Sequence, residues 1–194
     1  MPLVLATRNK GKIAELSRLL VDWQVQTCDA YPGCPVPEET GDTFHENALI
    51  KARVIASFTQ MITLADDSGL EVDALEGAPG VYTARFAGPD AGDSENRNKL
   101  LQVLSAIPNQ ERTARFRCVM AIITPDGREW TIDGVCEGRI GWEDKGANGF
   151  GYDPIFVPIG YTQTFAELGV EIKNQISHRA EALNKAVTIL RTIS

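Results

Sequence analysis

The sequence lacks any long hydrophobic run, which argues against a membrane-spanning helix. No stretch of its 194 residues approaches the roughly 20 apolar residues that a helix needs to cross a bilayer. The opening segment, MPLVLATRNKGK, has no basic leader followed by an apolar stretch, so we expect no secretion signal. Internal repeats and low-complexity linkers are missing as well. These absences predict a cytoplasmic protein without a membrane partner.

Cysteine is scarce, and its spacing shows no metal-binding pattern. The four cysteines are Cys28, Cys34, Cys118 and Cys136, and no two of them form a CxxC pair. We interpret all four as reduced thiols, as is usual in the cytoplasm, and we expect neither a disulfide nor a zinc site.

Basic residues are outnumbered by acidic ones, 19 against 26, which gives a net charge of −7. This balance argues against binding nucleic acid or anionic lipid through bulk electrostatics. The charges are unevenly spread, because residues 6–12 carry three cations and no acid, whereas residues 38–42 carry three acids and no cation. A small basic segment in an acidic protein suits a small anionic ligand better than a polymer.

Apolar residues recur with helix and strand periods along the whole chain. We expect strands at 2–7, 61–65, 69–75, 113–124 and 128–138, and helices at 11–21, 42–58, 93–107 and 177–190. Strand–helix alternation at the front and a hairpin in the middle predict an α/β fold with helices packed on a mixed sheet. We expect a single domain over residues 1–194, in which a smaller lobe including roughly 111–140 leaves a cleft.

The segment TRNKGK, residues 7–12, joins a predicted strand to a predicted helix. A helix N-terminus offers unpaired amide groups and the positive end of a dipole, so it favours phosphate. Lys12, with Arg8 or Lys10, adds positive charge. The segment is not a Walker loop, because that pattern needs a glycine where Ala6 stands. A basic helix start exposed to water is the alternative interpretation.

Two pairs of adjacent carboxylates, Glu38–Glu39 and Asp66–Asp67, are candidates for a metal site. The pair Asp66–Asp67 follows the apolar stretch MITLA, so we predict it at the C-terminal end of a buried strand, where ligands gather in α/β sheets. Adjacent buried carboxylates repel each other and are costly to desolvate. Mg²⁺, which binds one or two carboxylates together with phosphates, would compensate. For Glu38–Glu39, a solvated loop is the alternative.

Two further segments carry candidate contacts for a nucleotide base. In ISHRAEAL, Ser177 is a candidate N-cap that places His178 and Arg179 in the first helical turn, where cations oppose the dipole unless an anion or a base edge binds there. In NGFGYDP, glycine permits close approach of a ligand, and Phe150 or Tyr152 can stack on a base. The alternatives are an exposed polar helix start and a flexible loop with one buried ring.

Five longer segments contain these candidates: LATRNKGKIAEL, EETGDTFHENALIKA, ADDSGLEVDALEGAPGVYTARFAG, GFGYDPIF and ISHRAEAL. They are spread over nearly the whole chain, from Leu5 to Leu183. Together they closely resemble the inosine triphosphate pyrophosphatase family, the Ham1/RdgB-type nucleotide diphosphatases. The resemblance implies an elongated mixed sheet in two lobes around a central cleft, and a homodimer.

The resemblance also implies a reaction. Deaminated purine triphosphates (ITP, dITP and XTP) are hydrolysed to the monophosphate and pyrophosphate by Mg²⁺-assisted attack of water, which cleanses the nucleotide pool. Asp67 matches the proton acceptor and a metal ligand, and Glu39 matches a second metal ligand. The matching substrate contacts are Thr7, Arg8, Asn9, Lys10, Gly11, Lys12, Ser68, Phe150, Gly151, Tyr152, Asp153, Lys173, His178 and Arg179. Supporting candidates are Asp66, Lys51 and Glu38.

The charges agree with this implied reaction. Lys12, Lys173 and Mg²⁺ can hold the negative triphosphate, while the carboxylates hold the metal. Donors on His178 and Arg179 can bind O6 of a 6-oxo purine. The amino group of adenine would leave these donors unpaired, and such a mismatch can reject an analogue by ~10⁴-fold.

Two other functions fit some of the same residues. A Maf-like pyrophosphatase acting on other nucleotides would share the broad architecture. A non-catalytic nucleotide-sensing module would share the phosphate loop, although binding a polyanion gains little from four carboxylates. The acidic balance disfavours a nucleic-acid-binding protein.

Overall fold

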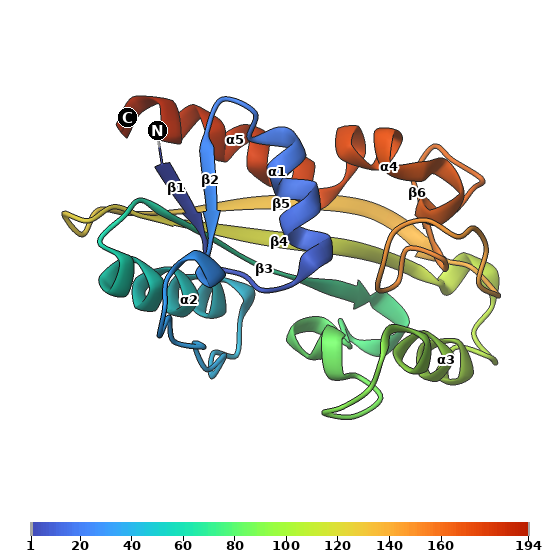
Figure 1. Ribbon diagram of the computed structural model, residues 1–194. Helices are drawn as coiled ribbons and strands as arrows, with labels where there is room; N and C mark the ends of the chain where they lie inside the picture. The colour runs from blue at the N-terminus through green and yellow to red at the C-terminus, as the bar shows by residue number, and fades with distance from the viewer. Residues whose placement is uncertain (1, 194) are drawn as a thin grey trace. The chain divides into compact units, whose positions relative to one another are not determined.

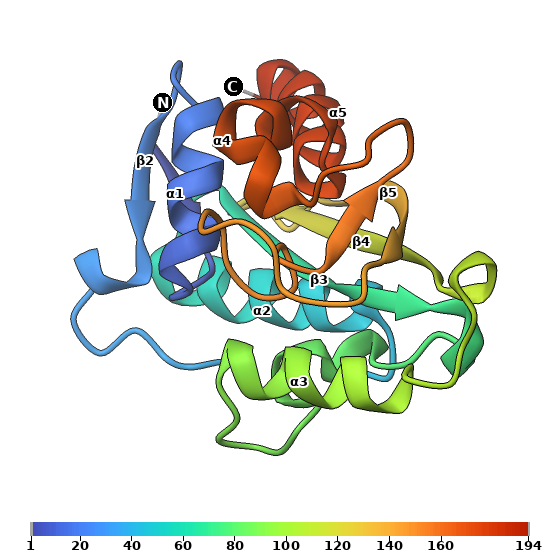
Figure 2. The same cartoon turned by 90° about the vertical axis from the view of Figure 1, so that its right-hand side faces the viewer.

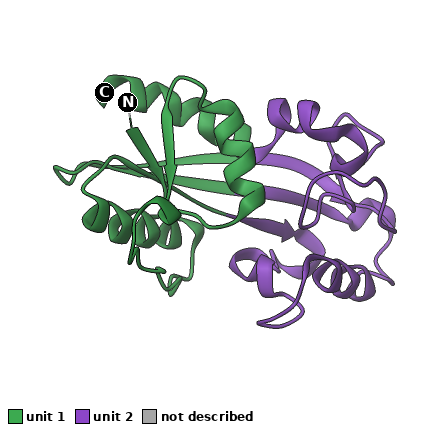
Figure 3. Cartoon of the chain, in the orientation of Figure 1, with its two compact units in different colours: residues 1–67, 118–134, 179–194 green, residues 68–117, 135–178 purple. Residues whose placement is uncertain are grey.

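The computed structural model describes residues 2–193 and divides into two compact units (Figure 3). Unit 1 comprises the described residues of the ranges 1–67, 118–134 and 179–194, and unit 2 comprises 68–117 and 135–178. The predicted hairpin therefore contributes residues to both units. A single domain with a smaller lobe around 111–140, and a cleft between lobes, stay predictions.

Six strands form one mixed sheet in the order β2-β1-β3-β4-β5-β6. The strands are β1 (Pro2–Leu5), β2 (Gln24–Thr27), β3 (Thr63–Val72), β4 (Thr113–Ile123), β5 (Glu129–Ile140) and β6 (Phe156–Pro158). Strand β1 runs parallel to both β2 and β3, whereas β5 and β6 are antiparallel. The predicted mixed sheet and the predicted hairpin, which is formed by β4 and β5, are confirmed.

Five α-helices and four short 3₁₀ helices complete the described fold (Figure 1). The α-helices are α1 (Lys10–Leu19), α2 (Phe44–Thr59), α3 (Asp93–Val103), α4 (Phe165–Ile176) and α5 (His178–Ile193). The 3₁₀ helices are η1 (Cys28–Ala30), η2 (Asp73–Leu75), η3 (Gly80–Arg85) and η4 (Asn109–Glu111). Among residues 2–193, no helix is both long enough and apolar enough to cross a membrane.

Capping interactions explain where the helices begin. The hydroxyl of Thr43 accepts a hydrogen bond from the amide of Glu46, and the Glu46 side chain accepts one from the Thr43 amide, which together form a capping box at the start of α2. Thr164 and Glu167 form the same arrangement at α4. We did not predict α4 from the sequence, although its Thr-x-x-Glu signal is present there, and we did not predict the short strand β2.

In unit 1, α1 and α5 lie on one face of the sheet and α2 lies on the other (Figures 1 and 2). The first face is filled by buried apolar side chains, including Leu3, Leu5, Leu16, Leu20, Leu64, Met120, Ile122, Leu183 and Leu190. On the second face, α2 buries Ala48, Ala52 and Ile55, which are members of its predicted apolar stripe.

In unit 2, the strands lie between α3 and α4 (Figure 2). Aromatic rings dominate its core, because Phe116 contacts Phe156 with a centroid distance of 4.6 Å and Phe156 contacts Phe165 at 5.3 Å. Leu100 of α3 and Leu104, the C-cap residue that follows α3, are fully buried in the same cluster. All four cysteines are free thiols.

One expectation about β3 is wrong. We placed Asp66 and Asp67 at the end of one strand and began a second strand after them, but β3 continues without a break from Thr63 to Val72. The neighbouring strand β1 is the one that ends here, because Leu5 pairs with Leu64 and is the last residue of β1. The carboxylates therefore lie in mid-strand, just beyond the carboxyl end of a parallel neighbour.

Candidate functional site

The loop between β1 and α1 is organised as the sequence predicts. Asn9 is the N-cap of α1, and its side chain accepts a hydrogen bond from the amide of Lys12 at 3.1 Å. The Thr7 hydroxyl accepts from the Asn9 amide at 3.2 Å, and Arg8 donates to the carbonyl of Cys34 at 2.8 Å. The first turn of α1, with Lys10 and Lys12, therefore directs its amides and positive dipole end toward the end of β1.

Asp66 lies in a charge-balanced network of unit 1. Its Oδ2 contacts Lys12 Nζ at 3.0 Å and Arg179 Nε at 3.3 Å, and Arg179 also pairs closely with Glu15. These four groups carry two positive and two negative charges. Burial would raise the pKa of Asp66, but Lys12 and Arg179 outweigh burial and hold that pKa well below its usual range.

Asp67 lies in a different network, which has an excess of negative charge. Lys51 Nζ bridges Asp67 Oδ1 at 2.7 Å and Glu39 Oε1 at 2.8 Å, so one cation serves two carboxylates. Burial raises the pKa of Asp67 above its usual value, and the attraction of Lys51 only partly offsets burial. Adjacent residues on one strand thus have opposite pKa shifts because their partners differ.

Helix α2 positions both Lys51 and the loop that carries Glu39. Asn47, which is buried, accepts from the Gly41 amide at 2.8 Å and donates to the Gly41 carbonyl at 3.2 Å. Lys51 follows one turn later on the same buried face. A side chain at Gly41 would lie 2.5 Å from Cβ of Glu46, so only glycine lets the loop approach α2 this closely.

The carboxylates of Glu39 and Asp67 suit a hard divalent cation. Both converge on a single point of positive charge, the Lys51 ammonium. Within residues 2–193, no group of three or more His, Cys, Asp and Glu side chains is arranged to hold a metal. Two carboxylates match the way proteins bind Mg²⁺ together with substrate phosphates, which supply the remaining oxygen ligands.

The loop that carries Phe150 to Asp153 forms a separate group in unit 2. Asp153 Oδ2 accepts from the Phe150 amide at 2.9 Å and from Lys173 Nζ at 2.5 Å. The Lys173 ammonium also lies 4.5 Å from the centroid of the Phe150 ring, within cation–π range. Lys173 and Asp153 are almost fully buried, so their charges neutralise each other beneath a half-buried aromatic ring.

The remaining predicted contacts of unit 2 are also located. His178 stacks on Phe116 with a centroid distance of 4.7 Å and an interplanar angle of 12°. Tyr152 is buried and donates its hydroxyl hydrogen bond to the Thr83 carbonyl at 2.9 Å, which makes it part of the unit 2 core. Ser68 follows the Asp pair on β3 and is half-buried.

The predicted site residues thus form two groups, one in each unit. In unit 1, ion pairs join Lys12, Glu39, Lys51, Asp66, Asp67 and Arg179 into the two networks described above. In unit 2, contacts join Phe150, Asp153 and Lys173. Glu38 is exposed. The catalytic and binding roles of these residues stay predictions.

Two residues that sequence reasoning missed hold the unit 1 networks together. The first residue is Glu15, which is buried on α1 and pairs with Arg179. A carboxylate among the apolar positions of a helix is a sequence signal for a buried ion pair, and it could have been noticed. Its partner Arg179 lies 164 positions away along the chain, so the pairing itself had no sequence signal. The second residue is Asn47, whose two hydrogen bonds to Gly41 hold the loop that carries Glu39.

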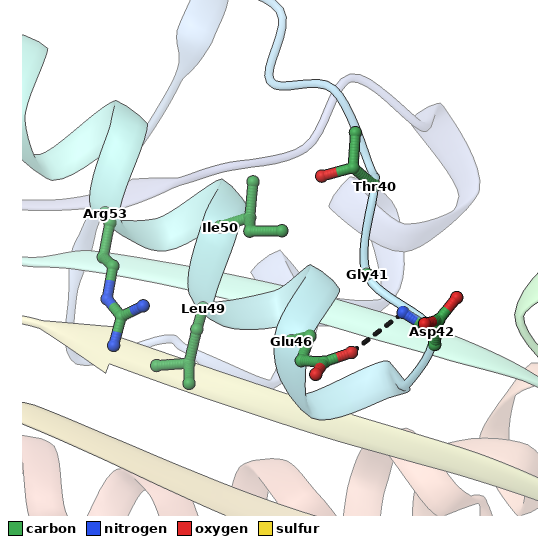
Figure 4. A pocket seen from close by; sticks show the side chains of 7 residues that line it. All are labelled: Thr40, Gly41, Asp42, Glu46, Leu49, Ile50 and Arg53. Atoms are coloured by element: carbon green, nitrogen blue, oxygen red, sulfur yellow. Dashed lines mark hydrogen bonds between the residues drawn. The ribbon is translucent and has the colours of Figure 1, made fainter.

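A surface pocket of about 330 Å³ lies between α2 and the loop that precedes it (Figure 4). It is lined by Thr40, Gly41, Asp42, Glu46, Leu49, Ile50 and Arg53. None of these residues belongs to either network. The α2 residues among them are not those that α2 buries, so this pocket is not the predicted site.

Comparison with known proteins assigns the chain to a family. The sequence model of the Ham1 family matches residues 3–189. The chain belongs to the Ham1 family. The dITP/XTP pyrophosphatase of Desulforamulus reducens is a relative with 56% identity, and the alignment covers 100% of this chain and 97% of that protein. The dITP/XTP pyrophosphatase of Shouchella clausii is 50% identical over 93% of this chain and 92% of its own length.

Solved structures of Ham1 proteins have the same fold. The HAM1 protein from Coxiella burnetii superposes with a TM-score of 0.89 at 43% identity, covering 99% of both chains. The predicted family membership and the mixed α/β fold with flanking helices are therefore confirmed.

Proposed function

We propose that this Ham1 protein hydrolyses dITP, ITP and XTP to the nucleoside monophosphate and pyrophosphate with the help of Mg²⁺. The relatives named above carry the name dITP/XTP pyrophosphatase at 50–56% identity over nearly their full length, which supports this enzyme class. Removal of deaminated purines from the nucleotide pool is the consequence that we infer for the cell.

The observation that carries the proposal is the bridge from Glu39 through Lys51 to Asp67. In this bridge two carboxylates share the Lys51 ammonium, next to the end of β1, where the TRNKGK loop begins. Lys12 of that loop contacts Asp66, the direct neighbour of Asp67. The start of α1, to which we assign the phosphates, and the Glu39–Asp67 carboxylate pair, to which we assign the metal, therefore both belong to unit 1.

The residues of unit 1 divide the chemistry as follows. The first turn of α1 and Lys12 bind the phosphates. Asp67, whose pKa burial raises, accepts the proton of the attacking water as the oxygen forms its bond to phosphorus and the bond between the α- and β-phosphates breaks. Glu39 and Asp67 would hold Mg²⁺, which would supply positive charge to the phosphate oxygens. Asp66 keeps Lys12 and Arg179 in place.

The residues of unit 2 recognise the base in this proposal. The Phe150 ring offers a flat surface for stacking, and the Lys173–Asp153 pair fixes its position from below. The ring of His178 is fixed by stacking on Phe116. Donation from His178 to O6 would favour 6-oxo purines over adenine.

The test is pyrophosphate release from a panel of triphosphates, with and without Mg²⁺. We expect turnover of dITP, ITP and XTP that is at least about 100-fold faster than turnover of ATP, since unpaired polar groups penalise the wrong base. Turnover chiefly of modified or pyrimidine nucleotides would instead favour the Maf-like alternative. Binding of ITP without any cleavage would favour a nucleotide-sensing module.

We further propose that the protein is a cytoplasmic homodimer, because the resemblance to its family implies a homodimer. Light scattering coupled to size-exclusion chromatography measures the mass directly. A mass near twice 21.2 kDa agrees with a dimer, whereas a mass near 21.2 kDa contradicts it.

A further inference from the structure

The loop between β5 and β6, residues 141–155, needs external support to hold Phe150 in place. It has no regular secondary structure, and Gly149 and Gly151 have φ angles of 79° and 59°. Glycine permits these conformations, but it also leaves the unbound loop with many other conformations. Something must therefore fix the backbone on either side of Phe150.

Helix α3 supplies two charged side chains to one residue of this loop. Asp93 Oδ2 accepts a hydrogen bond from the Gly151 amide at 2.7 Å, and Arg97 Nη1 donates to the Gly151 carbonyl at 2.8 Å. Both polar groups of Gly151 are thus bound by α3. Asp93 and Arg97 are four residues apart, so they lie on the same face of the helix.

Arg97 also reaches the start of the loop. Its Nε donates to Asp144 Oδ2 at 2.8 Å, so one guanidinium joins two loop positions that are seven residues apart. The Arg97 side chain is only 14% exposed, and hydrogen bonds to charged groups are roughly twice as strong as neutral ones. The planar fork of arginine makes both contacts at once, which a lysine cannot do in this geometry.

The two peptide planes next to Gly151 are those that link it to Phe150 and to Tyr152. Fixing the amide on one side and the carbonyl on the other fixes the direction in which the chain leaves toward Phe150. Asp153 completes the restraint by accepting from the Phe150 amide at 2.9 Å. The ring above Lys173 is then oriented by backbone contacts as well as by its own packing.

We propose that Asp93 and Arg97 are positioning residues for base recognition, acting through Gly151 on the Phe150 ring. The proposal rests on the proposed function of Phe150 in base stacking. Neither residue touches the substrate in this account. Their loss should therefore weaken binding of the base and leave the chemical step at Asp67 unchanged.

The experiment compares Asp93→Ala, Asp93→Asn and Arg97→Ala with the unaltered protein in ITP hydrolysis. Alanine and asparagine both remove the negative charge from the first turn of α3, but only asparagine keeps an oxygen that can accept from Gly151. We expect KM for ITP to rise roughly 10-fold in the two alanine variants, with kcat within about 2-fold. Asp93→Asn should stay close to the unaltered protein. Gln102→Ala, exposed on the same helix, is the control.

A second measurement reports on the loop without catalysis. Hydrogen exchange of the Gly151 amide should speed up at least about 10-fold in Asp93→Ala and much less in Asp93→Asn. If Arg97→Ala does not fold, Arg97→Lys is measured in its place. The comparison of Asp93→Ala with Asp93→Asn then decides the test.

The outcomes separate the two proposals. If the unaltered protein does not cleave ITP, the proposed function fails, and base positioning fails with it. If it cleaves ITP but the alanine variants keep their KM, or lose kcat instead, only the positioning role is overturned. A lower melting temperature with unchanged KM would assign both residues to stability alone.

Discussion

The two units each contain buried ion pairs, but they balance charge differently. In unit 1, the paired groups Glu15, Glu39, Asp66 and Asp67 face three cations, Lys12, Lys51 and Arg179. The surplus negative charge falls on Glu39 and Asp67, which share one lysine. In unit 2, Lys173 and Asp153 form a balanced pair beside aromatic rings.

The difference indicates what each unit can bind. A carboxylate pair with too little positive charge is stabilised by an additional cation, and phosphates can accompany that cation. A neutral pair beneath a half-buried ring attracts no ion, but it holds a flat surface in place for a base. Variants of each group should therefore change different properties of the enzyme.

The largest effect is expected from Asp67→Asn. Asparagine keeps the shape of the side chain but cannot accept a proton, so kcat for ITP should fall by about 10³-fold or more, with KM within a few-fold. Steady-state pyrophosphate release measures both constants. Asp42→Asn, an equal change of charge on the exposed part of the 38–42 loop, should keep full activity. A kcat for Asp67→Asn near that of the unaltered protein would remove Asp67 from its assigned role.

Asp66→Asn should act on stability more than Asp67→Asn does. Replacing Asp66 leaves Lys12 and Arg179 short of a buried partner, so unfolding in urea without Mg²⁺ should show a loss of about 3 kcal/mol. Asp67→Asn should change the free energy of unfolding by less than about 1 kcal/mol, because it relieves a surplus of negative charge. Equal losses in the two variants would contradict the proposed division between them.

The same pair predicts how stability depends on pH. The pKa of Asp66 in the folded protein lies below its usual value, so the folded state binds fewer protons than the unfolded state. The stabilisation is complete above the usual aspartate pKa of about 4 and is lost as pH falls through the folded value. Acid titrations of unfolding should show this decline in the unaltered protein, and a shallower decline in Asp66→Asn.

Lys12→Ala should chiefly weaken the binding of triphosphate. It removes a cation from the first turn of α1, and we expect KM for ITP to rise about 30-fold. KM for ITP should increase more steeply with salt concentration in the unaltered protein than in the variant. Arg18→Ala, exposed in the last turn of the same helix, is the control for loss of one positive charge. An unchanged KM would show that Lys12 serves only Asp66.

Phe150→Leu should produce the smallest change and confine it to the base. Losing the stacking surface should lower kcat/KM for ITP about 10-fold. The Mg²⁺ concentration needed for half-maximal activity should stay the same, since the metal carboxylates lie in unit 1. A change in that Mg²⁺ concentration would contradict the assignment of metal binding to unit 1 and base binding to unit 2.

Local features of the fold could be predicted from the sequence. The capping box of α2 needs only Thr43 and Glu46, and the apolar stripe of α3 needs only the spacing of Leu100 and Leu104. The loop before α1 likewise follows from a strand, a cap and a helix that are adjacent in the chain.

Features that depend on distant neighbours could not be predicted in the same way. Where Asp66 lies in β3 depends on where β1 ends, which is a matter of sheet pairing and not of the MITLA pattern. The separation of roles between Asp66 and Asp67 depends on Arg179 and Lys51, which come from other elements. Helix α4 contains Gly169 with a φ of 79° and non-helical geometry, which interrupts its periodicity.

The binding of Mg²⁺ tests the division between the two adjacent aspartates most directly. Isothermal titration calorimetry with Mg²⁺ in the presence of a non-hydrolysable ITP analogue measures this binding. The affinity for Mg²⁺ should be at least about 10-fold weaker in Asp67→Asn, because this variant lacks one charged metal ligand. Folded Asp66→Asn should bind Mg²⁺ within about 3-fold of the unaltered protein. The reverse result, with Mg²⁺ binding lost in Asp66→Asn and kept in Asp67→Asn, would contradict the account.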